Sequence, residues 1–141
     1  MSRYVNENLR AQVELRAGGF CEYCRIAIED TYFGSEIDHI ISLKHRGQTE
    51  FENLALACQP CNRSKGSDLG SIPQTSKILI RFFNPRIDDW TEHFRVNADA
   101  EIEPLTEIGE VTAFIFRFND LDRIAERRGL IELGRYQIKQ G

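Results

Sequence analysis

Four cysteines stand in two closely spaced pairs, Cys21 with Cys24 and Cys58 with Cys61. A CxxC turn points two thiolates at one centre, and a second such turn completes the tetrahedron of a structural zinc ion. The segment between the pairs, residues 25–57, has 33 residues. Simple zinc ribbons have a spacer of about 15–20 residues. We therefore expect a zinc ion that holds both ends of an inserted segment.

The inserted segment and the residue after the second pair supply the polar groups of a hydrolytic reaction. Asp38 and His39 are neighbours, and Asn62 directly follows Cys61. An imidazole can take a proton from water, and carboxylate and amide oxygens are the ligands that Mg²⁺ or Mn²⁺ prefers. A divalent ion on Asp38 and Asn62 beside His39 would suit phosphodiester hydrolysis. A second possible role for Asn62 is to cap the helix after Cys61.

Short elements must position these residues. The pattern of residues 4–17 predicts an amphipathic helix that ends at Gly18, and residues 36–41 are β-prone. The two-residue period of a strand puts Asp38 and His39 on opposite faces. Residues 59–65 predict a short helix that ends at Gly66. The expected fold class is α+β.

The chain resembles the HNH endonuclease family in the patterns CEYC, EIDHI, GxTxxxNL and CxxCNxxK. The resemblance implies a ββα-metal core stapled by the four-cysteine zinc, with His39 as the general base and Asp38 as a ligand of the catalytic divalent ion. It also implies that Asn53 orders the loop and supports the geometry of His39. Asn62 stands where many members carry the last histidine, and Ser42 stands where proline is frequent.

The family's hairpin and helix bind in the DNA minor groove, so the resemblance implies DNA as the partner. Basic residues near the motif are then candidates for phosphate contacts, which position the backbone and read no sequence. They are Lys44, His45, Arg46, Arg63 and Lys65. With no recognition helix in the pattern, we expect weak sequence preference.

Residues 71–141 are expected to extend the core of residues 1–70 and to pack on it. Their pattern predicts a hairpin about residues 97–100 and a helix capped by Thr106, although a strand is an alternative there. A final helix is expected to begin at Asp120 and to end near Gly129. His93 stands between residues of core type and is expected to be structural.

Composition limits the classes of function. The net charge is −4, so any DNA-binding surface must be a local basic patch. The longest apolar runs are too short for a membrane span, and no apolar signal segment stands near Met1, so we expect a cytoplasmic protein without membrane contact. The rival to an endonuclease is a catalytically silent, zinc-dependent module that binds nucleic acid or protein. A CxxC redox protein is disfavoured because the βαβ context is missing.

Overall fold

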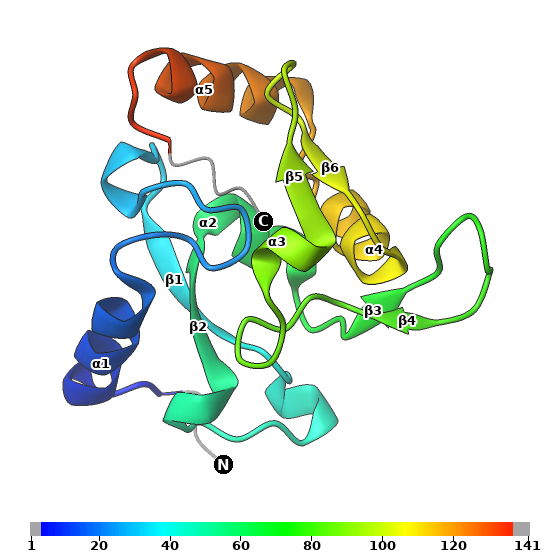
Figure 1. Ribbon diagram of the computed structural model, residues 1–141. Helices are drawn as coiled ribbons and strands as arrows, with labels where there is room; N and C mark the ends of the chain where they lie inside the picture. The colour runs from blue at the N-terminus through cyan, green and yellow to red at the C-terminus, as the bar shows by residue number, and fades with distance from the viewer. Residues whose placement is uncertain (1–3, 137–141) are drawn as a thin grey trace. The chain divides into compact units, whose positions relative to one another are not determined.

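The computed structural model describes residues 4–136 (Figure 1). Contacts between Cα atoms divide the chain into two compact units, Met1–Leu69 and Gly70–Gly141. They are called unit 1 and unit 2. Helices and small sheets mix in both, so the α+β class predicted from the sequence is confirmed. None of the helices within residues 4–136 is both long and apolar enough to cross a membrane.

Unit 1 begins with helix α1, Glu7–Ala17. The side chain of Asn6 caps its first turn by accepting a hydrogen bond from the Leu9 amide at 2.8 Å. Gly18 ends the helix in the left-handed conformation, with φ +67°, as the sequence predicts. One 3-10 turn, Ile28–Asp30, precedes the first strand of unit 1, and two more, Leu43–His45 and Phe51–Asn53, lie between its two strands.

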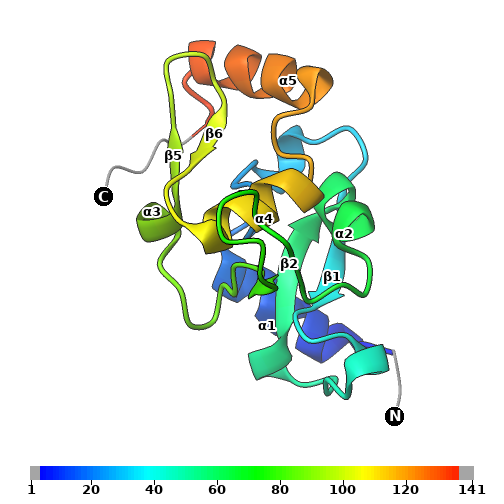
Figure 2. The same ribbon diagram turned by 90° about the vertical axis from the view of Figure 1, so that its right-hand side faces the viewer.

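Two antiparallel strands and a helix form the centre of unit 1. Strand β1, Ser35–His39, pairs with β2, Leu54–Cys58, in a register that runs from Ser35 opposite Cys58 to His39 opposite Leu54. Helix α2, Gln59–Lys65, follows β2 without a break, and Figure 2 shows it beside both strands. The predicted helix 59–65 and its end at Gly66 are therefore confirmed, and the topology is ββα.

The two faces of this sheet contact different parts of unit 1. On one face, Val13 of α1 forms a buried core with Leu54 and Leu56 of β2, and Ile37 of β1 packs against this core. The other face of β1 carries Glu36 and Asp38, whose side chains meet α2. All five residues of β2 are buried, and its sequence is accordingly an unbroken apolar run.

Between residues 70 and 136, unit 2 contains two hairpins and three helices. Strands β3 (Gly70–Ser71) and β4 (Ile80–Arg81) pair, as do β5 (Phe94–Val96) and β6 (Ile102–Pro104). The helices are α3 (Trp90–His93), α4 (Glu107–Ile115) and α5 (Leu121–Glu132). The predicted hairpin is confirmed, and Thr106 caps α4 by accepting from the Gly109 amide at 3.0 Å. The expected helix end at Gly129 is wrong, because α5 continues through it.

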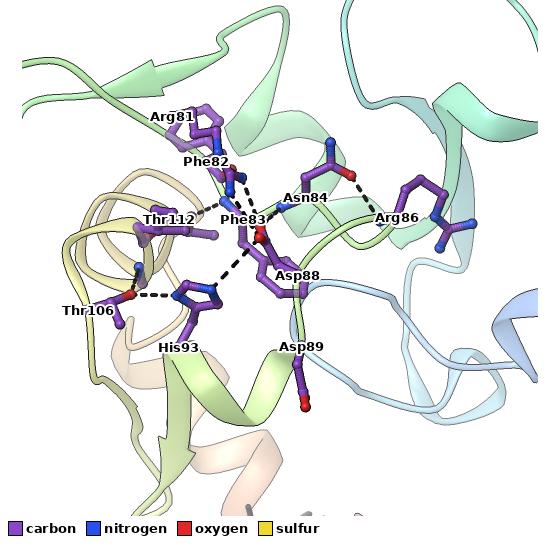
Figure 3. A network of polar contacts seen from close by, with 12 residues as sticks. Arg81, Phe82, Phe83, Asn84, Arg86, Asp88, Asp89, His93, Thr106 and Thr112 are labelled. Carbon is purple, nitrogen blue, oxygen red and sulfur yellow. Dashed lines mark hydrogen bonds and ion pairs between the residues drawn. The ribbon is translucent and has the colours of Figure 1, made fainter.

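A polar network fixes the segment of unit 2 between β4 and α3 (Figure 3). The carboxylate of Asp88 accepts from two nitrogens of Arg81, at 2.8 and 2.9 Å, and from the Asn84 amide at 2.9 Å. His93 Nε2 lies 3.9 Å from Asp88, and His93 Nδ1 lies 2.6 Å from the Thr106 hydroxyl. His93 is buried in this network, which agrees with its expected structural role.

Replacing Asp88 by asparagine is expected to destabilise unit 2 by about 1–3 kcal/mol, since hydrogen bonds to a charged group are lost. The Arg81 guanidinium lowers the pKa of Asp88. A lowered pKa in the folded state means that the unfolded chain binds the proton more tightly. The wild type should therefore lose stability as the pH falls below about 4, and the variant should lose less.

Urea unfolding followed by fluorescence measures this effect. Trp90 is the chain's single tryptophan and is buried in unit 2, so it reports on that unit. Asp122→Asn, an exposed change in α5, is the control. Equal stability of Asp88→Asn and the wild type at neutral pH would contradict the assigned role.

Candidate functional site

The sulfur atoms of the four cysteines gather at one point. All four are buried, and their Sγ atoms lie within 4.8 Å of one another. The Sγ atoms of Cys24 and Cys58 are 3.7 Å apart. A tetrahedron with zinc–sulfur bonds of about 2.3 Å has sulfur–sulfur edges of about 3.8 Å. The thiols are therefore spaced as the ligands of one tetrahedral metal ion.

The thiols of this cluster would lose their protons only with the help of a bound cation. Burial and the neighbouring thiols raise the pKa of Cys61, and hydrogen bonds within the cluster, with Cys21 foremost, raise the pKa of Cys58. Four thiolates at this spacing are stable only around a positive ion. The site joins the turn after α1 to the end of β2 and the first turn of α2.

Asp38 lies at the centre of a buried polar cluster on the α2 side of β1. One carboxylate oxygen accepts from the Tyr23 hydroxyl at 2.6 Å and the other from Lys65 Nζ at 3.2 Å. Lys65 Nζ also donates to the His39 carbonyl at 3.0 Å. Burial raises the pKa of Asp38, while Lys65 and Tyr23 act in the opposite direction. Burial, followed by the charge of Asp38, raises the pKa of Tyr23.

The position of Lys65 corrects one prediction. Its side chain is only 2% exposed, and its ammonium is held by Asp38 and the His39 carbonyl. In this position it cannot reach a phosphate, so the predicted contact is withdrawn. The other predicted contacts, Lys44, His45, Arg46 and Arg63, are exposed.

His39 ends β1 and is half-buried. Its Nε2 atom lies 2.9 Å from the hydroxyl of Thr49. A hydroxyl can donate or accept, so it accommodates either tautomer of the ring. This contact fixes one edge of the imidazole.

Asn53 ties the loop after β1 to the start of β2. Its Oδ1 accepts from the Ile41 amide, and its Nδ2 donates to the carbonyls of Ile41 and Gln48, each at 2.9 Å. Gly47 passes so close that a Cβ atom there would lie 1.7 Å from the Ile41 carbonyl oxygen. Asn53 therefore connects Ile41 and Gln48 across the loop.

Replacing Asn53 by aspartate is expected to loosen this loop while the strands stay paired. The carboxylate can still accept from Ile41, but it faces two carbonyl oxygens to which it cannot donate. The cost should be about 1–3 kcal/mol, because two hydrogen bonds worth about 0.5–1.5 kcal/mol each are lost. Hydrogen exchange measured by mass spectrometry should rise in residues 41–48. Glu52→Gln is the control, and unchanged exchange in Asn53→Asp would contradict the assignment.

Asp38, His39 and Asn62 line one cavity of about 440 Å³. The remaining lining residues come from β1, from the turn after it and from the end of α2: Ile37, Ser42, Leu43, Lys44, Gly66 and Ser67. Asn62 lies inside α2, and its Nδ2 donates to Glu36 at 2.7 Å, so the alternative role as a helix cap is wrong.

The residues fit a hydrated divalent ion. A carboxylate has about four acceptor positions, and the two bonds to Asp38 leave others free. The amide of Asn62 adds a neutral oxygen. Few protein ligands and several waters are the usual environment of Mg²⁺, although the ammonium of Lys65 already neutralises Asp38.

The family model of the HNH endonuclease matches residues 21–68. Residues 21–68 form an HNH domain. The domain begins at Cys21 and contains all four clustered cysteines, together with Asp38, His39, Asn53 and Asn62. Unit 2 lies beyond the matched residues. A search of curated proteins gives no match to the chain.

Three residues of the HNH domain escaped the sequence analysis: Tyr23, Glu36 and Thr49. Each acts through a partner far along the chain, as Tyr23 does with Asp38 and Thr49 with His39. One signal was available for Glu36. Glu36 shares a strand face with Asp38. Asn62 and Lys65, three residues apart, share a helix face. A contact of Asp38 with this helix face would therefore have suggested a second contact, made by Glu36.

Proposed function

We propose that the HNH domain is a metal-dependent endonuclease that hydrolyses DNA phosphodiester bonds. The observation that carries this proposal is the shared cavity of Asp38, His39 and Asn62, adjacent to the four-cysteine site. An imidazole and two oxygen-bearing side chains around one cavity suit the hydrolysis of a phosphodiester. The match to the HNH endonuclease family supports the same reaction class.

In this proposal each side chain has a defined task. His39 takes the proton from the attacking water, and Thr49 orients its ring through Nε2. Asp38 and Asn62 hold a Mg²⁺ or Mn²⁺ ion, which when bound supplies positive charge to the phosphate oxygens. Lys65 and Tyr23 fix the orientation of the Asp38 carboxylate, and Asn53 holds the loop in place.

The four cysteines hold a structural zinc ion. The zinc keeps the end of β2 and the start of α2 against the 21–24 turn, so it fixes the direction in which Asn62 leaves the helix. Thiolate ligands of this kind persist in a reducing compartment such as the cytoplasm. The exposed side chains of Lys44, His45, Arg46 and Arg63 contact the DNA backbone, with weak sequence preference.

One observation favours the silent binding module as a second candidate. Both oxygens of Asp38 already accept hydrogen bonds, and Lys65 neutralises its charge. Such a site binds a divalent ion less tightly than a free carboxylate would.

Nicking of supercoiled plasmid separates the two functions. The endonuclease converts it to open circles in Mg²⁺ or Mn²⁺ and not in EDTA at a concentration that leaves the zinc bound. The silent module shifts the plasmid in a gel without nicking it, and added Mg²⁺ changes nothing. Single-stranded and branched substrates, run in parallel, report which DNA form is preferred.

A further inference from the structure

Glu36 contacts the amide of Asn62 in a way that determines which end of that amide is available. Glu36 Oε2 lies 2.7 Å from Asn62 Nδ2. A carboxylate only accepts hydrogen bonds, so the amide must present its nitrogen to Glu36. The oxygen of the same amide then points away from Glu36. Among residues 4–136, no group donates a hydrogen bond to this oxygen.

Asn62 is a lining residue of the cavity described above. Asn62 lines it together with Asp38 and His39, whereas Glu36 does not. The oxygen of Asn62 is therefore the end of the amide that faces the cavity. An amide turned the other way would present two N–H donors, which repel a cation.

The backbone explains why Glu36 is held in this place. Glu36 and Asp38 are two residues apart on one face of β1, and Asn62 and Lys65 are three apart on one face of α2. The pairs Glu36–Asn62 and Asp38–Lys65 therefore form neighbouring contacts between the same two elements. Arg63 adds a weaker contact to Glu36 at 3.5 Å, through a side chain that is 71% exposed.

We propose that Glu36 is a positioning residue that holds Asn62 with its oxygen toward the cavity and so sets the affinity of the site for a divalent ion. The inference rests on the proposed metal site. Groups that orient a metal ligand in this way typically change metal affinity about 10–100-fold when they are replaced. The carboxylate also adds negative charge near the ion, and the experiment must separate that effect.

The test is isothermal titration calorimetry with Mn²⁺ on the zinc-loaded full chain. Glu36→Gln keeps the shape but can donate as well as accept, so it allows both orientations of the Asn62 amide. We expect it to weaken Mn²⁺ binding about tenfold or more. In an Asn62→Ala background only the smaller effect of the lost charge should remain. Glu52→Gln, the same chemical change at an exposed position, is the control, and zinc content checks the fold.

Three outcomes overturn the proposal. If Glu36→Gln weakens binding equally in both backgrounds, its effect is one of charge and not of orientation. If Asn62→Ala weakens binding and Glu36→Gln does not, Glu36 has no positioning role, while the proposed metal site stands. If Asp38→Ala and Asn62→Ala both bind Mn²⁺ as the wild type does, the metal site itself is wrong, and the role of Glu36 with it.

Discussion

Replacing His39 by alanine is expected to slow plasmid nicking about 10²–10⁴-fold, the usual contribution of a general base. The side chain lies at the cavity shared with Asp38 and Asn62, and Thr49 fixes its Nε2 edge. Its removal should leave the strands intact, because Ile37, not His39, packs in the core of unit 1. Initial rates in Mg²⁺ and in Mn²⁺, at saturating and at low plasmid concentration, measure the effect.

His45 provides a matched control for this experiment. It is a histidine in the same domain but is exposed in the turn after β1. His45→Ala should weaken plasmid binding slightly, through a lost phosphate contact, and leave the maximal rate close to the wild type. Equal nicking by His39→Ala and the wild type would contradict the assignment of the base. A mobility shift that persists in both variants would show that binding and chemistry are separate.

Loss of the cysteine-bound metal is expected to unfold unit 1. Structural zinc contributes about 10–16 kcal/mol in small zinc-binding peptides, and the stability of a whole domain is only about 5–15 kcal/mol. Only Val13, Leu54 and Leu56 are fully buried in the core cluster of α1 and β2, so we expect unit 1 to depend on the metal. Cys61→Ser removes one of the four ligands from inside α2. Hydrogen exchange in residues 54–58 should then approach the rate of an unfolded chain.

A second change in the same helix controls for α2 itself. Ser64→Ala leaves the four thiolates in place and should keep the wild-type protection. Elemental analysis should find about one zinc per chain in the wild type and in Ser64→Ala, but much less in Cys61→Ser. Trp90 fluorescence follows unit 2 in the same samples. Full protection of β2 in zinc-free protein would refute the structural role of the metal.

Features that depend on neighbouring residues were predictable from the sequence. The cysteine pairs, the end of α2 at Gly66 and the cap of α4 at Thr106 each follow from a few adjacent residues. The hairpin of β5 and β6 belongs to the same class. Gly129 misled the prediction, because a glycine inside a helix costs only about 1 kcal/mol and α5 continues through it.

Contacts between distant residues were not predictable in the same way. Lys65 stands in a basic stretch and reads as a phosphate contact, yet it is buried against Asp38. Its direction depends on the register of β1 on β2 and on the angle at which α2 crosses them, and neither follows from composition or periodicity. The same reason hid Tyr23 and Thr49, whose partners lie 15 and 10 residues away.

The shortness of α2 has a consequence for how this domain tolerates change in length. Within seven residues, the helix turns Cys61 toward the other three cysteines and turns Asn62 and Lys65 toward β1. Each inserted residue rotates everything after it by about 100° around the helix axis. A single insertion between Cys61 and Asn62 would keep all four cysteines in place. It would nevertheless turn the side chains of Asn62 and Lys65 away from β1. Natural length variation should therefore occur in the loops around this helix and not within it.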